Sequence, residues 1–245
     1  MSGHVFLVGA GPGDPGLITV KGLDILRSAE FVVYDALANP ILLKECINAE
    51  LIDAGKRNSK HKMSQTDINS LLVSLGKEGK RVVRLKGGDP FLFGRGAEEA
   101  AALREAGINV SVIPGVSSSI AVPELAGIPV THRGHSPMVT FITGHEMDDK
   151  DHNINWKKLA EGMGTIVILM GMSNADAISR SLIEGGMSPD TGASITVSGS
   201  TEKERTVVTT VSKLSSSITE HKLEAPGIIV VGNVVSERNK LGDMR

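Results

Sequence analysis

The sequence predicts an α/β protein made of two α/β domains. Short apolar runs alternate with amphipathic stretches along most of the 245 residues. The 28 glycines, beside one Trp and one Tyr, are typical of tight strand-to-helix connections rather than of an aromatic-rich sandwich. The alternation restarts with a different character after residue 136. We therefore expect an N-terminal α/β domain at 1–113, a crossover at 114–136 and a C-terminal α/β domain with a mixed sheet at 137–245.

The chain opens with a buried strand at 4–8, a glycine-rich turn at 9–16 and a helix at 17–29. Strand, turn and helix together form the first half of a βαβ unit. The turn approaches the dinucleotide fingerprint G-x-G-x-x-G, but Asp14 stands where a glycine is required. An acidic side chain at that point would repel a pyrophosphate. We expect this turn to face a neutral or cationic ligand, or only to shape the chain.

The second strand, at 30–34, is followed directly by Asp35. Ligands of open α/β sheets bind at the carboxyl ends of the strands, which makes Asp35 a candidate acid or base. Capping of the next helix is the alternative. A third strand at 51–54 and a helix that begins with a capping-box pattern at 64–67 complete this part of the chain.

A strand at 81–85 leads into Gly87, Gly88, Asp89 and Pro90, and a helix at 97–106 follows. Paired glycines let backbone amides approach a ligand, and the start of a helix attracts anions. A tight strand-to-helix turn without further function is the alternative. The dense charge around residues 91–93 favours a functional site.

Positive charge is concentrated between residues 56 and 95, where ten Lys and Arg face three acids. This window has a net charge of +7 and the remainder −9, which together give the −2 of the whole chain. Such an excess predicts an anionic partner. Aromatic residues that could stack on bases are scarce here, so we expect a small polyanion and no nucleic acid.

The second half contains expected strands at 138–143, 165–170, 193–198, 205–211 and 227–231, and helices near 155–161, 173–185 and 211–221. The segments 193–198 and 205–211 are expected to form an antiparallel hairpin. Before them, a strand at 108–113 leads to small residues at 114–119 that could admit a flat ring against the backbone or cap a helix. That helix is expected at 120–126.

The remaining features exclude several classes of protein. Cys46 is the single cysteine, which leaves no intramolecular disulfide and fits a reducing compartment; we interpret it as a helix residue. No segment predicts a secretory signal or a membrane span, so we expect a soluble cytoplasmic protein without a membrane partner. His132 and His135 lack neighbouring Cys or carboxylate ligands in the sequence, so no metal site is expected. Neither a G-x-S-x-G elbow nor a Walker A motif occurs.

Several stretches together resemble the uroporphyrinogen-III C-methyltransferases, a group of tetrapyrrole methylases that use S-adenosylmethionine. They are VGAGPGDPGLITVKG at 8–22, VYD at 33–35, GKR at 55–57, VRLKGGDPF at 83–91, GRG at 94–96 with EE at 98–99, IPG at 113–115, GIP at 127–129, THRG at 131–134 and TGH at 143–145. Each motif alone is weak, but their order and spacing make the joint match specific. The match is dense from residue 5 to 145 and weaker afterwards.

The resemblance implies the tetrapyrrole methylase fold, two α/β domains with an active-site cleft between them, usually in a homodimer. It also implies transfer of two methyl groups from S-adenosylmethionine to C2 and C7 of uroporphyrinogen III. The products are precorrin-2 and S-adenosylhomocysteine, and precorrin-2 feeds sirohaem, cobalamin and haem d1 biosynthesis. A metal is not implied.

The resemblance also assigns residues. Asp35 would be a base and Lys56 its acidic partner, although positioning alone could suffice. The substrate carboxylates would be held by Arg84, Arg95 and Arg133, with Arg57 as a further candidate, while Glu98 would position an arginine or accept a pyrrole N–H. The residues implied for the cofactor are Pro12, Gly87, Gly88, Asp89, Leu92, Ser117, Ser118, Met170, Gly199 and Ala225, with Asp89 facing its cationic amino-acid end.

Two other functions stay open from the sequence. A later corrin-ring methylase would share the fold and the cofactor but act on another precorrin; the THRG and GRG motifs favour the earlier enzyme. A non-catalytic module that binds a tetrapyrrole or a nucleotide is the second alternative, against which Asp35 and Lys56 argue.

Overall fold

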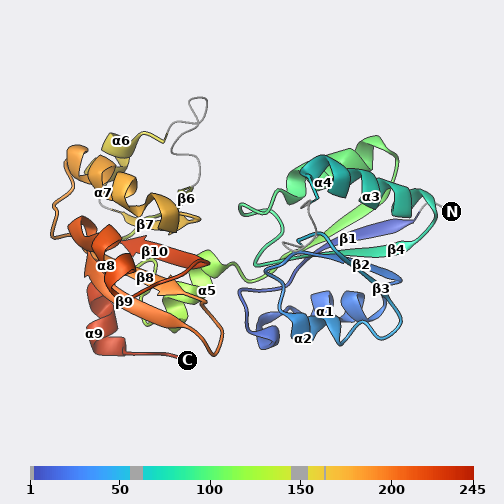
Figure 1. Cartoon of the computed structure of the whole chain (residues 1–245), viewed down its shortest axis with the longest axis horizontal. Helices are drawn as coiled ribbons and strands as arrows, with labels where there is room; N and C mark the ends of the chain where they lie inside the picture. The colour runs from blue at the N-terminus through green and yellow to red at the C-terminus, as the bar shows by residue number, and fades with distance from the viewer. Residues whose placement is uncertain (1–2, 56–62, 145–153, 163) are drawn as a thin grey trace. The chain divides into compact units, whose positions relative to one another are not determined.

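The chain divides into two units, Met1–Ser117 and Ser118–Arg245, in a computed structural model that describes residues 3–55, 63–144, 154–162 and 164–245. The division falls inside the segment 114–136 that was expected to cross between domains. Helix α5 (Ser118–Leu125) within that segment belongs to the second unit. Each unit has its own five-stranded sheet (Figure 1).

The sheet of the first unit is entirely parallel, with the strand order β3-β2-β4-β1-β5. Its strands are β1 (His4–Gly9), β2 (Phe31–Tyr34), β3 (Glu50–Asp53), β4 (Arg81–Lys86) and β5 (Asn109–Ile113). Since parallel strands all end at one edge, the loops that follow them meet there. This arrangement confirms the α/β class expected for the first half.

Helices cover both faces of this sheet, which is why its strands β1 and β2 are nearly continuous apolar runs. One face carries α1 (Val20–Arg27) and α2 (Pro40–Leu43), and the other carries α3 (Gln65–Lys77) and α4 (Gly96–Glu105) (Figure 1). The helix expected at 17–29 is shorter than expected. A 3-10 turn, η1 (Pro15–Leu17), comes first, and the side chain of Thr19 then caps α1.

Two local expectations in the first unit have different outcomes. The capping box is confirmed, because Ser64 accepts the amide of Asp67 and the Asp67 carboxylate accepts the amide of Ser64. The interpretation of Cys46 as a helix residue is wrong. It follows α2 in a turn, where it is buried among the side chains under that helix.

The sheet of the second unit is mixed, as expected, with the order β6-β7-β10-β8-β9. Its strands are β6 (Val139–Thr143), β7 (Thr165–Leu169), β8 (Gly192–Val197), β9 (Arg205–Thr210) and β10 (Gly227–Val231). Only β6 and β7 are paired in parallel, and β8 with β9 forms the expected antiparallel hairpin.

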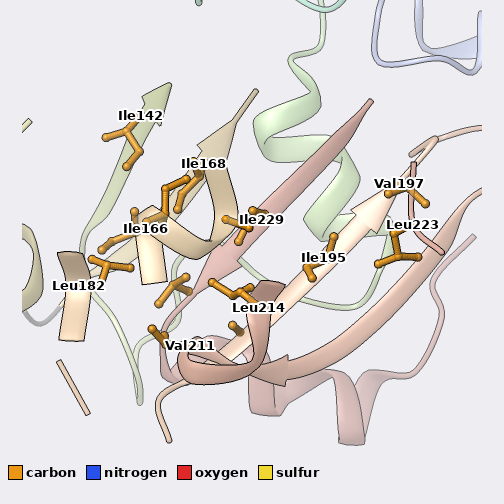
Figure 2. Close-up of a cluster of buried hydrophobic side chains, with 14 residues drawn as sticks. Ile142, Ile166, Ile168, Leu182, Ile195, Val197, Val211, Leu214, Leu223 and Ile229 are labelled. Carbon is orange, nitrogen blue, oxygen red and sulfur yellow. The ribbon is translucent and has the colours of Figure 1, made fainter. Parts of the chain in front are cut away.

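The main core of this unit lies between the sheet and the helices α6 (Trp156–Glu161), α7 (Ala175–Glu184) and α8 (Leu214–Glu220). Figure 2 shows side chains of this core, which come from strands, as Ile195 does, from the helices α7 and α8, and from Val211 in the turn before α8. The opposite face of the sheet is covered by α5 and by η5 (Asn233–Glu237), after which α9 (Arg238–Leu241) ends the regular structure. The described residues include no helix that is long and apolar enough to cross a membrane.

Candidate active site

The carboxyl edge of the first sheet brings together four of the loops that the sequence singled out. Asp35 follows β2, Pro12 lies in the turn after β1, Gly87 to Asp89 follow β4, and the small residues that begin at 114 follow β5. The capping alternative for Asp35 is wrong, since Asn39 caps α2. Lys56, expected to be the acidic partner of Asp35, and Arg57 lie outside the described residues.

Three of these loops pack backbone against backbone. Gly11 and Gly88 exchange amide hydrogen bonds, with N···O distances of 3.3 and 2.7 Å. A Cβ on Gly9 would lie only 2.5 Å from the Cα of Gly115 and 2.6 Å from the carbonyl oxygen of Gly88. Any side chain at Gly9 would push the loops apart, so glycine is required here by close approach.

Asp89 fastens the loop after β4 by accepting three backbone amides. Its Oδ1 accepts the N–H of Phe91 at 2.8 Å and of Leu92 at 3.0 Å, and its Oδ2 accepts the N–H of Gly115 at 3.2 Å. Hydrogen bonds to an ionised carboxylate are stronger than neutral ones. The side chain therefore ties the loop after β4 to the loop after β5. Pairing with a cationic ligand stays a prediction.

A chain of alternating charges runs inward from Asp35. Its Oδ1 lies 2.5 Å from Nη2 of Arg84, whose Nε donates to Oε1 of Glu99 at 3.0 Å. The Nζ of Lys86 donates to the same oxygen at 3.0 Å. The side chains of Arg84, Lys86 and Glu99 are at most 3% exposed, whereas that of Asp35 is 31% exposed. The network thus leads from the interior to an accessible carboxylate.

Strand alternation explains why these groups meet. Val33 and Val82 face the helices α3 and α4, so Asp35, Arg84 and Lys86, at even steps along the same strands, face that side as well. Glu99 comes from α4 on that face. Burial and the neighbouring Arg84 lower the pKa of Lys86 from its ordinary value, although Glu99 opposes this effect.

This geometry corrects the expectation for Arg84 and shows how part of the positive window is distributed. The guanidinium of Arg84 is bound between Asp35 and Glu99, so a direct grip on a substrate carboxylate is not supported. The described Lys and Arg residues of the window 56–95 do not share one surface. Arg84 and Lys86 are buried, and Arg81 stands at the start of β4, at the opposite edge of the sheet from Asp35.

Arg95 and Glu98 lie on the surface beside this edge and pair with each other. Arg95 donates from Nη2 and Nε to the two carboxylate oxygens of Glu98 at 2.7 and 2.9 Å. This pairing raises the pKa of Arg95 and lowers that of Glu98. Both side chains are more than half exposed. The Arg95 guanidinium therefore lies where a carboxylate ligand could replace Glu98 or share the guanidinium with it.

The second unit gathers other predicted residues at one edge of its own sheet. Met170 follows β7, Gly199 follows β8, and Ala225 precedes β10; the register pairs the end of β7 and the end of β8 with the start of β10. The amide of Ser198 donates to the carbonyl of Pro226 at 3.0 Å.

Left-handed backbone is concentrated in these loops of both units. Of the six described non-glycine residues with positive φ, five lie next to or among the predicted site residues. They are Phe93, Arg95, Met170, Ser198 and Ser200. Non-glycine residues adopt this conformation at a cost, and such residues cluster at functional sites.

Ser117, Ser118 and Arg133 complete the predicted set. Ser117 ends the first unit and Ser118 is the first residue of α5. Arg133 is exposed in the turn between His132 and Ser136, which form an antiparallel bridge. The binding roles of these three residues stay predictions.

His132 and His135, in the turn that carries Arg133, were expected to lack a neighbouring carboxylate, and the structure corrects this expectation. Glu237, remote in sequence, lies 2.7 Å from Nε2 of His135 and 4.0 Å from that of His132. Two features favour an ion-pair cluster over a metal site: Lys240 already donates to Glu237 at 2.7 Å, and the amide of Gly134 donates to Nδ1 of His132. Lys240 and His135 lower the pKa of Glu237.

Comparison with known proteins agrees with this organisation. The family model of the tetrapyrrole (corrin/porphyrin) methylases matches residues 4–215. The chain belongs to the tetrapyrrole methylases. An S-adenosyl-L-methionine-dependent uroporphyrinogen III methyltransferase of Methanosarcina barkeri is 47% identical to this tetrapyrrole methylase, over 99% of this chain and 96% of that one.

Two solved tetrapyrrole methylase structures extend the comparison. The Thermus thermophilus uroporphyrin-III C-methyltransferase complexed with S-adenosylhomocysteine has a TM-score of 0.80 and 35% identity, and covers 96% of this chain and 99% of that one. A cobalt precorrin-4 methyltransferase of cobalamin biosynthesis has a TM-score of 0.83 and 25% identity, with 95% of each chain covered. The tetrapyrrole methylase fold expected from the motifs is thereby confirmed.

Glu99 and Lys86 lie within the motifs of this tetrapyrrole methylase, but the resemblance assigned no role to either of them. The available signal was the charge at Arg84 and Lys86 inside a buried strand, since a buried charge requires a partner. The sequence could not say which acid supplies it.

Proposed function

We propose that this chain transfers methyl groups from S-adenosylmethionine to C2 and C7 of uroporphyrinogen III, giving precorrin-2 and S-adenosylhomocysteine. The observation that carries the proposal is the accessible carboxylate of Asp35, held by Arg84 at the carboxyl edge next to the loop of Gly87 and Gly88. The near-full-length similarity to the Methanosarcina barkeri enzyme supports this choice of donor and substrate.

The residues at this edge fit the cofactor. Pro12, Gly87, Gly88 and Leu92 belong to loops whose backbones are locked together, and the half-buried carboxylate of Asp89 suits the cofactor's ammonium group. Asp14 instead caps η1 through the amide of Gly16, so it shapes the turn. In the second unit, Met170, Gly199 and Ala225 are the proposed contacts, together with Ser117 and Ser118 at the division.

The chemistry requires little covalent work from the protein. Bound S-adenosylmethionine supplies an activated methyl group on a sulfonium. The pyrrole carbon forms the new C–C bond while the electron pair of the broken S–C bond stays on sulfur. A proton must then leave the methylated ring, and Asp35 is the proposed base, with Lys56 as the acid that returns protons. Orientation and exclusion of water supply the rest of the rate enhancement.

The substrate combines a ring system with eight carboxylates. Leu37 and Phe91, which are 63% and 49% exposed beside Gly87 and Asp89, offer apolar surface to the ring. Arg95 and Arg133, both exposed, are the proposed partners of the carboxylates. Glu98 holds the Arg95 fork until a carboxylate arrives.

The test is anaerobic incubation of the purified protein with uroporphyrinogen III and S-adenosylmethionine, followed by mass spectrometry of the tetrapyrrole. We expect a product heavier by two methyl groups from the unchanged chain. The Asp35→Asn variant, with cofactor binding intact, should turn over at least about 100-fold more slowly, the usual size of a general-base contribution. Normal turnover by this variant would remove Asp35 as the base.

A later precorrin is the second candidate substrate, favoured by the overall similarity to the cobalt precorrin-4 methyltransferase. An unmethylated uroporphyrinogen III, in a sample that still binds S-adenosylmethionine, would support this candidate. Binding of both without turnover of any tetrapyrrole would indicate a non-catalytic module.

We also propose a homodimer in the cytoplasm. The buried single thiol of Cys46 is consistent with a reducing compartment. Light scattering coupled to size exclusion should give twice the mass of the 25.8 kDa chain. A single-chain mass at micromolar concentration would contradict the dimer, and fractionation of the source cells tests the location.

A further inference from the structure

We propose that Glu99 is a positioning residue for the reaction, because it sets the orientation of Arg84 and thereby that of the Asp35 carboxylate. This inference rests on the proposed function, since it assigns a second layer of residues to the same site. Neither Glu99 nor its second partner Lys86 contacts the accessible edge: their side chains are 0% and 3% exposed.

The guanidinium of Arg84 is held at two points. Glu99 accepts from Nε at 3.0 Å on the inner side, and Asp35 accepts from Nη2 at 2.5 Å on the outer side. Weaker contacts run from Nη1 to the carbonyls of Val33 and Leu85 at 3.4 and 3.5 Å. Because a guanidinium is rigid and planar, anchoring one edge fixes the direction in which the opposite edge points. Asp35 therefore receives its orientation from Glu99.

Glu99 is itself held by three donors from two elements. Its Oε1 accepts from Arg84 and Lys86 of β4 at 3.0 Å each and from Nε2 of Gln65 of α3 at 3.2 Å. Its Oε2 is buried and has no hydrogen-bond partner among the described residues. Convergence of three donors on one oxygen fixes that oxygen in place.

Charge balance explains the presence of Lys86. Arg84 between Asp35 and Glu99 would leave one excess negative charge, and the ammonium of Lys86 offsets it. Burial of Lys86 is unfavourable, as its lowered pKa indicates. Buried ion networks are often no more stable than apolar replacements, so retention of four charges at this place points to a positioning role.

The test compares Glu99→Gln with the unchanged protein in the methylation assay. We expect kcat to fall about 10- to 100-fold, as expected for a misplaced catalytic group, while KM for S-adenosylmethionine stays within about two-fold. Glu105→Gln is the matched control, because Glu105 is an exposed acid on the same helix. An unchanged kcat in Glu99→Gln would overturn the proposal.

A double-mutant cycle separates positioning from a general loss of structure. In an Asp35→Asn background, Glu99→Gln should lower kcat by less than about two-fold, since two residues that act through one group are not additive. Full additivity would mean that Glu99 acts independently of Asp35, and the proposal would be wrong. Normal turnover by the single variant Asp35→Asn would show that Asp35 is not the base. Slow turnover by Asp35→Asn together with normal turnover by Glu99→Gln would reject only the positioning role of Glu99.

Arg84→Lys provides a second variant if Glu99→Gln does not fold. It keeps the positive charge but cannot bridge two carboxylates with a planar fork. Thermal unfolding and calorimetric binding of S-adenosylmethionine establish that it is folded. We expect the same selective loss of kcat, and wild-type kcat in folded Arg84→Lys would contradict the proposal.

Discussion

Asp89 has a structural task at the site that its charge alone does not reveal. Its carboxylate joins the loop after β4 to the loop after β5 through three backbone amides. We expect Asp89→Ala to weaken S-adenosylmethionine binding by at least about ten-fold, because hydrogen bonds to a charged group contribute about 1.5–3 kcal/mol each. The affinity of Asp89→Asn, which keeps one acceptor oxygen, should lie between the affinities of the unchanged protein and of Asp89→Ala. Calorimetry measures this, and wild-type affinity in Asp89→Ala would contradict the role.

Cys46 should be an unreactive thiol. Burial, with a smaller contribution from Glu45, raises its pKa to about 11, and its Sγ lies 3.7 Å from the carbonyl oxygen of Leu42. Because only the thiolate reacts, the folded protein should resist thiol reagents at neutral pH and react fully once denatured.

The sign of the pH effect follows from the raised pKa of Cys46. Any contribution of the neutral thiol to the free energy of unfolding is complete below the pKa that Cys46 has in the unfolded chain. It is lost as the pH rises towards about 11. The rate of reaction with a chromogenic disulfide reagent measures how accessible the Cys46 thiol is. Rapid labelling of the native protein at neutral pH would show that this thiol is not buried.

At the scale of elements, α3 depends on its capping box. Ser64 and Asp67 satisfy each other's amides at the start of the helix. Ser64→Ala should lower the free energy of unfolding by about 1 kcal/mol, the usual effect of a lost N-cap. Ser70→Ala, at an exposed position within the same helix, should be neutral or slightly stabilising, because Ala is the better helix former. Denaturant titration distinguishes the two, and equal effects would contradict the cap.

The packed glycine loops give a second prediction for elements. A Cβ on Gly9 would meet backbone atoms at 2.5 and 2.6 Å, whereas the nearest atom to a Cβ on Gly192 is 3.4 Å away. Gly9→Ala should therefore lose cofactor affinity and thermal stability, while Gly192→Ala keeps both. Thermal shift with and without S-adenosylmethionine checks this, and a fully stable, cofactor-binding Gly9→Ala would show that the loops separate easily.

The elements were predictable where their signals are local. The strands β1 and β2 are nearly continuous apolar runs because helices cover both faces of their sheet, and the capping box needs only residues 64–67. Pairings through space were not predictable. The resemblance assigned a role to Glu98 and none to Glu99, but the buried acid is Glu99, because the start of α4 at Gly96 decides which side chain faces the sheet. His135 and Glu237 are likewise far apart in sequence.

On the scale of the whole molecule, each unit carries part of the predicted site on one edge of its own sheet. The division after Ser117 was expected only as a segment, since a βα alternation that restarts does not say which unit keeps the connecting helix. Placement of Asp35 and Asp89 at one edge was predictable, because parallel strands end together. The occupation of Arg84 by two carboxylates was not, because it depends on how α4 packs on β4.

Labelled methyl groups show whether the protein methylates the two carbons C2 and C7. The protein would be incubated anaerobically with uroporphyrinogen III and S-adenosylmethionine that carries carbon-13 in its methyl group, and the product examined by carbon NMR. We expect two labelled methyl signals, assigned to C2 and C7, and none from the Asp35→Asn variant in the same time. Labels at other ring positions, or no label in the tetrapyrrole while the cofactor binds, would contradict it.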